Sequence, residues 1–312
     1  MPERADGGGR VVESARAKIN LYLDVVRRRE DGFHDIETLF QSLDLADEVA
    51  LEPRGDGRLT LECSLPGLCA PEDNLALRAA ALLRRHTGCR AGAHIRLEKR
   101  IPVAAGLAGG SADAAAALRG LNRLWGLALT HGDLAALALE LGSDVPYCLT
   151  GGLAAARGRG ECLTPLPPLP GDWHCLLVDP GIPVRAAQAY THPLLEKCGP
   201  PPEGENWTPR FRQAAALAAE GRLPELVFNR LERPVFHDHP LLAEIKEALL
   251  ARGARAAAMS GSGSVMFGLF RHADPVGDAA AAVAQSFPGV SVLRCGFSPA
   301  TLPSSDGCLR LD

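Results

Sequence analysis

The stretch from residue 102 to residue 125, PVAAGLAGGSADAAAALRGLNRLW, constrains the fold more than any other part of the chain. Three glycines, Gly106, Gly109 and Gly110, precede a run of alanine and leucine that repeats at helical spacing as far as Trp125. Glycine lets the backbone approach a ligand closely, and the free amides of a first helical turn attract anions. The pattern predicts a glycine loop leading into a helix, either as a phosphate site or as a simple tight turn.

Neighbouring residues exclude several other glycine-loop sites. No Lys-Ser or Lys-Thr pair follows Gly110, so the loop is not the common P-loop, and no glycine lies two residues after Ser111, as a hydrolase elbow requires. The spacing also fails the dinucleotide fingerprint. If the loop is a phosphate site, the expected ligand is the phosphate chain of a nucleotide. A second run, SGSGS at 260–264, is either a turn or a loop that closes over the same ligand.

Composition restricts the compartment and the partners. A chain of 312 residues is long enough for two domains, and its nine cysteines include no C-x-x-C pair, which argues against a disulfide framework or a zinc site. No apolar run approaches the roughly 18 residues of a membrane span, and the first residues lack the apolar core of a signal peptide. The net charge of -4 gives no electrostatic case for nucleic acid. We expect a cytoplasmic protein with neither nucleic acid nor membrane as partner, and its oligomeric state stays open.

Hydrophobic periodicity predicts a mixture of strands and helices, which is typical of an α+β fold. Strands are expected at 11–26, 48–52, 59–63, 94–98, 151–161, 175–181, 254–259, 265–270 and 291–295. Besides the helix after the glycine loop, helices are expected at 74–86, 130–142, 186–190, 211–220, 223–232, 240–252 and 276–286. The segment TPLPPLPGDW predicts a boundary near residue 165, which gives an N-terminal domain over 1–165 and a C-terminal domain over 166–312.

Three places have polar residues with two interpretations each. Lys18 and Asn20 share one face of the first strand, where they either reach a common ligand or form the wet side of a sheet. Phe33 and His34 follow a turn, and either bind a base or are a buried aromatic beside a solvent histidine. Asp144 lies just beyond a predicted helix, where an aspartate is usually a cap or turn residue.

In order and spacing, five segments resemble the GHMP small-molecule kinases. They are AKINLYL at 17–23, EDGFHDIETLFQSLDLAD at 30–47, PVAAGLAGGSADAA at 102–115, LGSDVPY at 141–147 and AMSGSGSVMFGLF at 258–270. The resemblance extends from about residue 15 to residue 296. The combination of AKINL with DGFH is similar to the branch of the family that acts on a cytidine diphosphate derivative of methylerythritol.

The resemblance implies a fold and an activity. The fold is an N-terminal domain like the second domain of ribosomal protein S5, followed by a C-terminal ferredoxin-like domain. The activity is transfer of the terminal phosphoryl group of ATP, with Mg²⁺, to the 2-hydroxyl of the methylerythritol moiety in non-mevalonate isoprenoid synthesis. Alternatives are a homoserine or mevalonate type of GHMP kinase, and a non-catalytic GHMP protein that senses a metabolite.

The resemblance also implies catalytic and nucleotide-binding residues. Asp144 becomes the base that accepts the hydroxyl proton, and Lys18 orients it and offsets charge on the phosphoryl group. The residues expected to bind ATP are Pro102, Ala104, Ala105, Gly106, Leu107, Ala108, Gly109, Gly110 and Ser111. The magnesium ligands stay open between Ser111 and Asp113.

The implied substrate site lies at the first strand and the turn after it. Asn20 is expected beside the methylerythritol, while Phe33 and His34 hold the cytosine by stacking and hydrogen bonding. Tyr190 is expected to supply the opposite aromatic face. Ala108 departs from the family pattern, which has glycine there, so this position loses conformational freedom.

Overall fold

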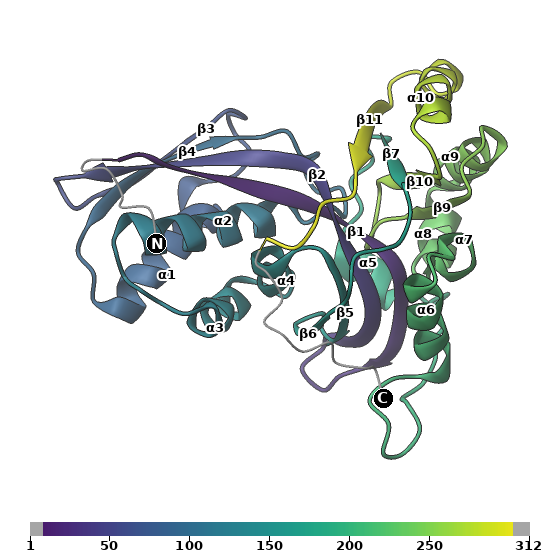
Figure 1. Ribbon diagram of the computed structural model, residues 1–312, viewed down its shortest axis with the longest axis horizontal. Coiled ribbons are helices and arrows are strands. Elements are labelled where there is room, and N and C mark those ends of the chain that lie inside the picture. Colours follow the sequence, from purple (N-terminus) through teal and green to yellow (C-terminus); the bar gives the residue numbers. More distant parts are fainter. Residues whose placement is uncertain (1–8, 302–312) are drawn as a thin grey trace. The chain divides into compact units, whose positions relative to one another are not determined.

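The computed structural model describes residues 9–301, and its chain forms two compact units whose segments alternate along the sequence (Figure 1). Unit 1 contains the chain up to Ala17 together with Leu45–Ile101 and Ala108–Leu149. Unit 2 contains Lys18–Asp44, Pro102–Leu107 and the chain from Thr150 onward. The division into 1–165 and 166–312 stays a prediction, because the compact units are not continuous in sequence.

Two long neighbouring strands, β1 (Val11–Arg28) and β2 (His34–Arg54), contribute residues to both units (Figure 1). The turn between them uses Gly32 at φ 85°, and the Asp31 carboxylate accepts a hydrogen bond of 3.1 Å from the Phe33 amide. The sequence predicted only residues 48–52 of β2. The strand is longer because no glycine or proline interrupts residues 34–52, and most of these residues are buried.

In unit 1, helices pack on a short sheet. Strand β4 (Gly92–Glu98) pairs in parallel with β3 (Leu59–Cys63) and antiparallel with the end of β2, from Glu48 opposite Glu98 to Arg54 opposite Gly92. The helices and the short 3₁₀ turn are η1 (Pro71–Asp73), α1 (Leu75–Thr87), α2 (Gly109–Leu124), α3 (His131–Leu141) and α4 (Val145–Thr150).

The core of unit 1 depends on the alanines of α2. Ala114, Ala117 and Leu118 are completely buried against strands and α1. Gly120 permits this close approach, because a Cβ there would lie 2.3 Å from Leu51 Cδ1. The predicted start of α3 is confirmed, since Thr130 caps it reciprocally with the side chain of the residue three positions later.

Unit 2 begins with the last part of β1 and the first half of β2. Strand β5 (Leu153–Gly158) pairs antiparallel with β2, from Ile36 opposite Gly158 to Gln41 opposite Leu153, and β6 (Cys162–Pro165) pairs with β5. The two-residue strand β8 (Phe228–Asn229) pairs in parallel with β1. The prediction of one helix over 223–232 is wrong, because pairing of β8 with β1 overrides local helical propensity.

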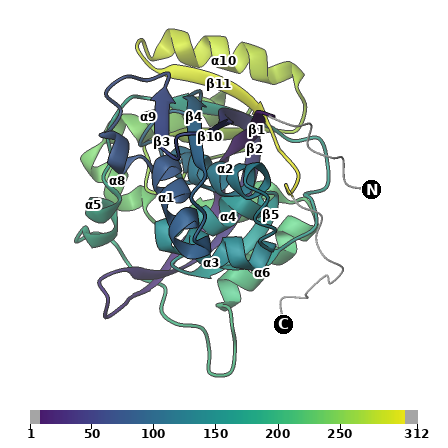
Figure 2. The same cartoon turned by 90° about the vertical axis from the view of Figure 1, so that its left-hand side faces the viewer.

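A separate antiparallel sheet of four strands completes unit 2. Its order is β11 (Ser291–Gly296), β7 (His174–Asp179), β10 (Met266–Phe270) and β9 (Ala256–Met259), which is the ferredoxin-like order that was expected. Helices α9 (Pro240–Ala251) and α10 (Asp274–Ser286) pack on this sheet, with α10 next to β11 in Figure 2. The other helices are α5 (Ala186–Thr191), α6 (Pro209–Ala219), α7 (Leu223–Leu226) and α8 (Glu232–Asp238).

Within residues 9–301, no helix has the length and apolar character needed to cross a membrane.

Candidate active site

A row of buried polar side chains lies on β1 in unit 2. Lys18 is 4% exposed and Asn20 is 3% exposed, and the Lys18 ammonium donates a hydrogen bond of 2.8 Å to Asn20 Oδ1. The Asn20 amide donates a bond of 2.8 Å to Thr38 Oγ1, which itself donates to the Tyr22 carbonyl at 2.6 Å. The interpretation of this face as the wet side of a sheet is wrong. The row holds a cation and an amide in fixed positions, as a polar ligand requires.

The first half of the glycine loop, residues 102–107, is fixed by backbone contacts within unit 2. The Leu107 carbonyl accepts a hydrogen bond of 3.1 Å from the Lys18 amide, and the Ala105 carbonyl accepts one of 3.3 Å from the Val265 amide. Ser260 Oγ donates a bond of 3.0 Å to the Gly106 carbonyl. The glycine-serine run at 260–264 therefore packs directly on the first glycine of the loop.

The second half of the loop begins helix α2 in unit 1. Ala108 is the N-cap residue at φ 57°, a left-handed conformation that alanine adopts with strain and that glycine would adopt freely. An alanine side chain cannot accept hydrogen bonds from the amides of Gly109, Gly110 and Ser111 in the first turn. These amides and the helix dipole provide the anion-binding chemistry that the sequence predicts.

A buried lysine with two carboxylates lies behind this turn, and no sequence pattern pointed to it. The Lys99 ammonium pairs with Asp47 and, at 2.6 Å, with Asp113 Oδ2. Asp47 also accepts hydrogen bonds of 2.5 and 2.8 Å from the amides of Arg100 and Ile101. A Cβ on Gly109 would lie 3.4 Å from Lys99 Nζ, so the cation lies just beneath the glycine turn. Asp47 and Asp113 lie 52 and 14 residues from Lys99, a spacing that no local pattern indicates.

This arrangement bears on the open choice of magnesium ligand. Asp113 is 3% exposed and binds Lys99 through Oδ2, so its carboxylate is less accessible than the Ser111 side chain to a metal that also contacts nucleotide. Among the described residues, no group of three His, Cys, Asp or Glu side chains could hold a metal. Mg²⁺ commonly takes one protein oxygen together with phosphate oxygens and water, and the Ser111 hydroxyl in the first turn of α2 fits that pattern.

Removing the Asp113 carboxylate is expected to flatten the pH dependence of stability. Burial raises the pKa of Asp113 from 3.8 to about 7, opposed by Lys99 and reinforced by Asp47. Asp113 then binds its proton more tightly in the folded state than in the unfolded state, so its own contribution to the free energy of unfolding should fall as pH rises from about 4 to about 7. At 1.36 kcal/mol per pKa unit, the change is at most about 4 kcal/mol.

Urea unfolding of the intact chain and of Asp113→Asn between pH 4.5 and 8 measures this effect. We expect the free energy of unfolding of the intact chain, relative to that of the variant, to fall as pH rises through this range. Parallel profiles for the two proteins would contradict the assignment of this titration to Asp113.

Two of the three aromatic residues expected at the base site, His34 and Tyr190, lie together in unit 2. The rings of His34 and Tyr190 stack with centroids 5.4 Å apart and an interplanar angle of 28°. Phe33 is 50% exposed, and the Arg159 guanidinium lies 3.9 Å from the centre of its ring. The alternative of a buried phenylalanine beside a solvent histidine is wrong, because His34 is 7% exposed.

The protonation state of His34 follows from its burial. Burial lowers the pKa of His34, and the charges of Lys197 and Arg28 lower it further. A neutral imidazole has one donor and one acceptor nitrogen, as hydrogen bonding to a base edge requires.

Asp144 belongs to unit 1, whereas Lys18 belongs to unit 2. Asp144 immediately precedes α4, and its carbonyl accepts a hydrogen bond of 3.1 Å from the Cys148 amide. Its backbone is therefore part of a helix start, consistent with the cap or turn position expected from the sequence. Its pairing with Lys18 stays a prediction.

Comparison with known proteins identifies the family. Models of the GHMP kinases match the N terminal domain over residues 74–152 and the C terminal domain over residues 210–289. A curated relative from Gloeobacter violaceus, named 4-diphosphocytidyl-2-C-methyl-D-erythritol kinase, is 44% identical over 289 residues, which are 90% of this chain and 92% of that protein. The chain belongs to the GHMP kinase family. A relative of the same name from Alkaliphilus metalliredigens is 41% identical over 83% of this chain and 87% of its own length.

Solved structures of GHMP kinases have the same fold. A crystal structure of 4-(cytidine 5'-diphospho)-2C-methyl-D-erythritol kinase superposes with a TM-score of 0.73 at 37% identity, covering 91% of this chain and 99% of that chain. Homoserine kinase from Cytophaga hutchinsonii has a TM-score of 0.74 at 20% identity, covering 96% and 98% of the two chains, and supports the fold alone. The predicted family and the predicted two-domain α+β fold are confirmed. This GHMP kinase is an ATP-dependent small-molecule kinase, as the sequence predicted.

Proposed function

We propose that this GHMP kinase transfers the terminal phosphoryl group of ATP to the 2-hydroxyl of 4-(cytidine 5'-diphospho)-2-C-methyl-D-erythritol, in non-mevalonate isoprenoid precursor synthesis. Two relatives named 4-diphosphocytidyl-2-C-methyl-D-erythritol kinase each match about nine-tenths of this chain and about nine-tenths of their own length. The observation in the structure that supports this acceptor is the stacked pair of His34 and Tyr190, together with the half-exposed ring of Phe33, the residue before His34. A base-stacking group suits a cytidine substrate, whereas homoserine and mevalonate contain no base.

The proposed chemistry uses one base and one cation. The 2-hydroxyl oxygen forms a bond to the terminal phosphorus while the bond from that phosphorus to the bridging oxygen of ADP breaks. The hydroxyl proton passes to the Asp144 carboxylate. The Lys18 ammonium, held by Asn20 at 2.8 Å, offsets charge on the transferring group.

The glycine loop positions the nucleotide in this proposal. Backbone amides at the start of α2 bind phosphate oxygens, and the buried charge of Lys99 lies beneath them. The residues proposed to contact ATP are Pro102, Ala104, Ala105, Gly106, Leu107, Ala108, Gly109, Gly110 and Ser111. Mg²⁺ would be held by the Ser111 hydroxyl and the phosphates, and it neutralises phosphate charge when bound. Asn20 is proposed to contact the methylerythritol.

We further propose a cytoplasmic location and no nucleic acid or membrane partner. The net charge of -4 supports the absence of a nucleic acid partner, and the eight described cysteines are all free thiols, as a reducing compartment favours. The division of function between residues 1–165 and 166–312 is retained as part of this proposal. The two matched family models lie on either side of residue 165, which supports it.

The test is ADP release from Mg-ATP by the purified chain with each acceptor in turn. The acceptors are the cytidylyl methylerythritol substrate, homoserine and mevalonate. We expect turnover with the cytidylyl compound alone. Phosphorylation of homoserine or mevalonate instead would overturn the acceptor but retain the kinase, and ATP binding without any turnover would favour a metabolite sensor.

Replacing His34 by alanine is expected to raise KM for the cytidylyl substrate by about tenfold and to leave KM for ATP within about twofold. Loss of a stacked ring and a base hydrogen bond costs on the order of 1–3 kcal/mol. Steady-state kinetics with either substrate varied measures both constants. His192→Ala is the matched control, because its ring contacts His237 instead of the proposed base site. Equal effects of the two variants would contradict a role for His34 in base binding.

A further inference from the structure

Asn229, in the short strand β8, has an exposed fraction of 3% and makes three hydrogen bonds. Its amide nitrogen donates to the Met259 carbonyl at 2.7 Å and to the Gly261 carbonyl at 2.8 Å. Its side-chain oxygen accepts a bond of 2.9 Å from the Leu231 amide. Both hydrogens of the amide group are therefore used, and both point to one turn, which begins at Met259.

That turn contacts residues proposed for both substrates. Ser260 Oγ donates to the Gly106 carbonyl at 3.0 Å, within the loop proposed for ATP. Gly261 lies so close to this loop that a Cβ there would be 3.2 Å from the Gly106 oxygen and 3.5 Å from Asn20 Oδ1. A small shift of the turn would therefore displace Gly106, and a larger shift would also reach Asn20.

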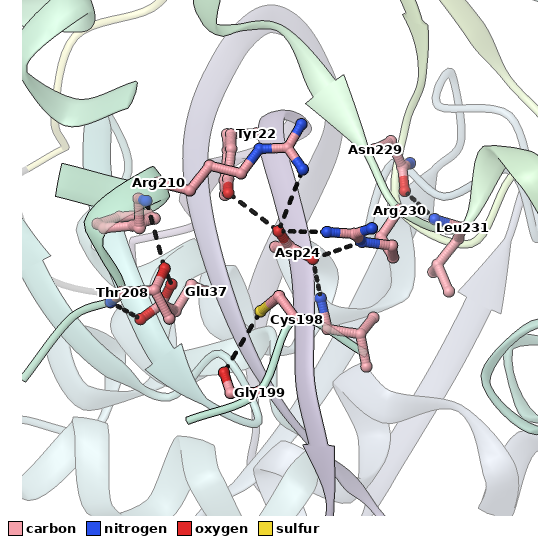
Figure 3. Close-up of polar contacts among 12 residues, drawn as sticks. Tyr22, Asp24, Glu37, Cys198, Gly199, Thr208, Arg210, Asn229, Arg230 and Leu231 are labelled. Atoms are coloured by element: carbon pink, nitrogen blue, oxygen red, sulfur yellow. Dashed lines mark hydrogen bonds and ion pairs between the residues drawn. The ribbon is translucent and has the colours of Figure 1, made fainter. Parts of the chain in front are cut away.

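The backbone of Asn229 is itself held by β1. Leu23 lies opposite Asn229 in the parallel strand pair, and the Leu23 carbonyl accepts a hydrogen bond of 2.8 Å from the Arg230 amide. Figure 3 shows the Arg230 guanidinium on the completely buried carboxylate of Asp24, with bonds of 2.7 and 3.0 Å. The Tyr22 hydroxyl donates to the same carboxylate at 3.1 Å (Figure 3). The bidentate pair of Arg230 with Asp24, to which the Tyr22 hydroxyl also donates, fixes the position of Arg230 and of the adjoining residue Asn229.

Glu232 is a second side chain that binds the start of this turn. Its carboxylate accepts a hydrogen bond of 2.9 Å from the Met259 amide and another of 2.6 Å from the Lys246 ammonium. The amide and the carbonyl of Met259 are thus bound by two side chains three residues apart in sequence. The segment NRLE at 229–232 therefore determines where the glycine-serine turn begins.

We propose that Asn229 is a positioning residue for phosphoryl transfer, which holds the turn from Met259 to Gly263 against Gly106 and Asn20. It acts through the backbone of this turn and does not touch the substrates. The proposal rests on the proposed kinase activity for its kinetic readout. It does not depend on the identity of the acceptor.

Asn229→Asp tests the proposal with almost no change in shape. The variant keeps an oxygen for the Leu231 amide, but it places a second oxygen against the two carbonyls that accepted hydrogen bonds. We expect kcat to fall by about 10- to 100-fold at 25 °C, because small displacements at a phosphoryl-transfer site have effects of this size. Hydrogen exchange in the peptide covering residues 259–265 should become faster in the same variant.

Leu249→Ala is the matched control for stability. Leu249 is completely buried in the core of unit 2, and its loss lowers stability without removing a hydrogen bond to the turn. We expect this variant to have a lower Tm, an unchanged exchange rate at 259–265 and a kcat within about twofold of the intact chain. Asn229→Ala leaves no oxygen facing the carbonyls, so it should lose less activity than Asn229→Asp. If the Asn229→Asp protein folds poorly, Asn229→Ala takes its place in the series.

The outcomes separate this proposal from the proposed function. The kinetic series uses the alcohol that the intact chain phosphorylates, so a wrong acceptor does not affect it. If the intact chain has no turnover, the Kd for ATP is measured in place of kcat. We expect this Kd to rise about tenfold in Asn229→Asp. The positioning role would be overturned if the loss of activity, of ATP affinity and of exchange protection in each of the three variants depended only on how far its Tm falls.

Discussion

Replacing Gly106 by alanine is expected to lower kcat/KM for ATP by more than about 10²-fold. Gly106 has φ 77°, and a Cβ there would lie 2.1 Å from the Ser260 oxygen and 3.3 Å from the Gly263 nitrogen. The contacted atoms belong to the backbone, so a side-chain rotation cannot relieve the clash. The glycine loop and the turn must separate, which displaces the loop residues that lead into α2. Steady-state kinetics and ATP titration of the variant measure the loss.

Gly181→Ala separates backbone strain from steric conflict. Gly181 has φ 68°, and a Cβ there would meet no described atom within 4 Å, so alanine introduces the strain without the clash. This control should lose about 1 kcal/mol of stability and retain activity within about twofold. If Gly106→Ala retained as much activity as the control, close packing of the turn on the loop would have no functional importance.

Replacing Asp144 by asparagine is expected to lower kcat by about 10²- to 10⁴-fold, the usual contribution of a positioned general base. The change preserves the size of the side chain and removes its capacity to accept the hydroxyl proton. KM for ATP should change by less than about threefold, because the base contacts the acceptor hydroxyl instead of the nucleotide. Single-turnover assays with saturating ATP separate this chemical step from product release.

The same substitution at Asp133 provides the control. Asp133 closes the cap of α3 with Thr130, so Asp133→Asn should lower stability slightly and leave kcat unchanged. A kcat for Asp144→Asn within about threefold of the intact chain would eliminate Asp144 as the base.

Sequence reasoning succeeded where the determining interactions are local. The start of α3 depends on Thr130 and a carboxylate three residues later, and α1 ends at Gly88 with φ 69°. The glycine loop and its helix followed from residues close together in the chain, and the family followed from five short segments in a fixed order. Local chemistry of this kind is visible without any knowledge of tertiary contacts.

Interactions between distant segments account for what was missed. Alternation along β1 placed Lys18 and Asn20 on one face, but it could not indicate that this face is covered. The helix predicted over 223–232 is interrupted because Phe228 pairs with Tyr22, which lies about two hundred residues earlier. Asn229 likewise acts on carbonyls 30 and 32 residues away, so its importance is not apparent from the segment NRLE alone.

The sharing of β1 and β2 between the two units has a consequence for synthesis on the ribosome. The first half of β2 reaches its neighbour β5 only when Leu153, which pairs with Gln41, has been made. At about 5–20 residues per second, the roughly one hundred intervening residues take about 5–20 s to add. During that interval the edge of the Lys18–Asp44 hairpin that will bind β5 has no strand partner, and an unpaired edge of this kind is a site of aggregation.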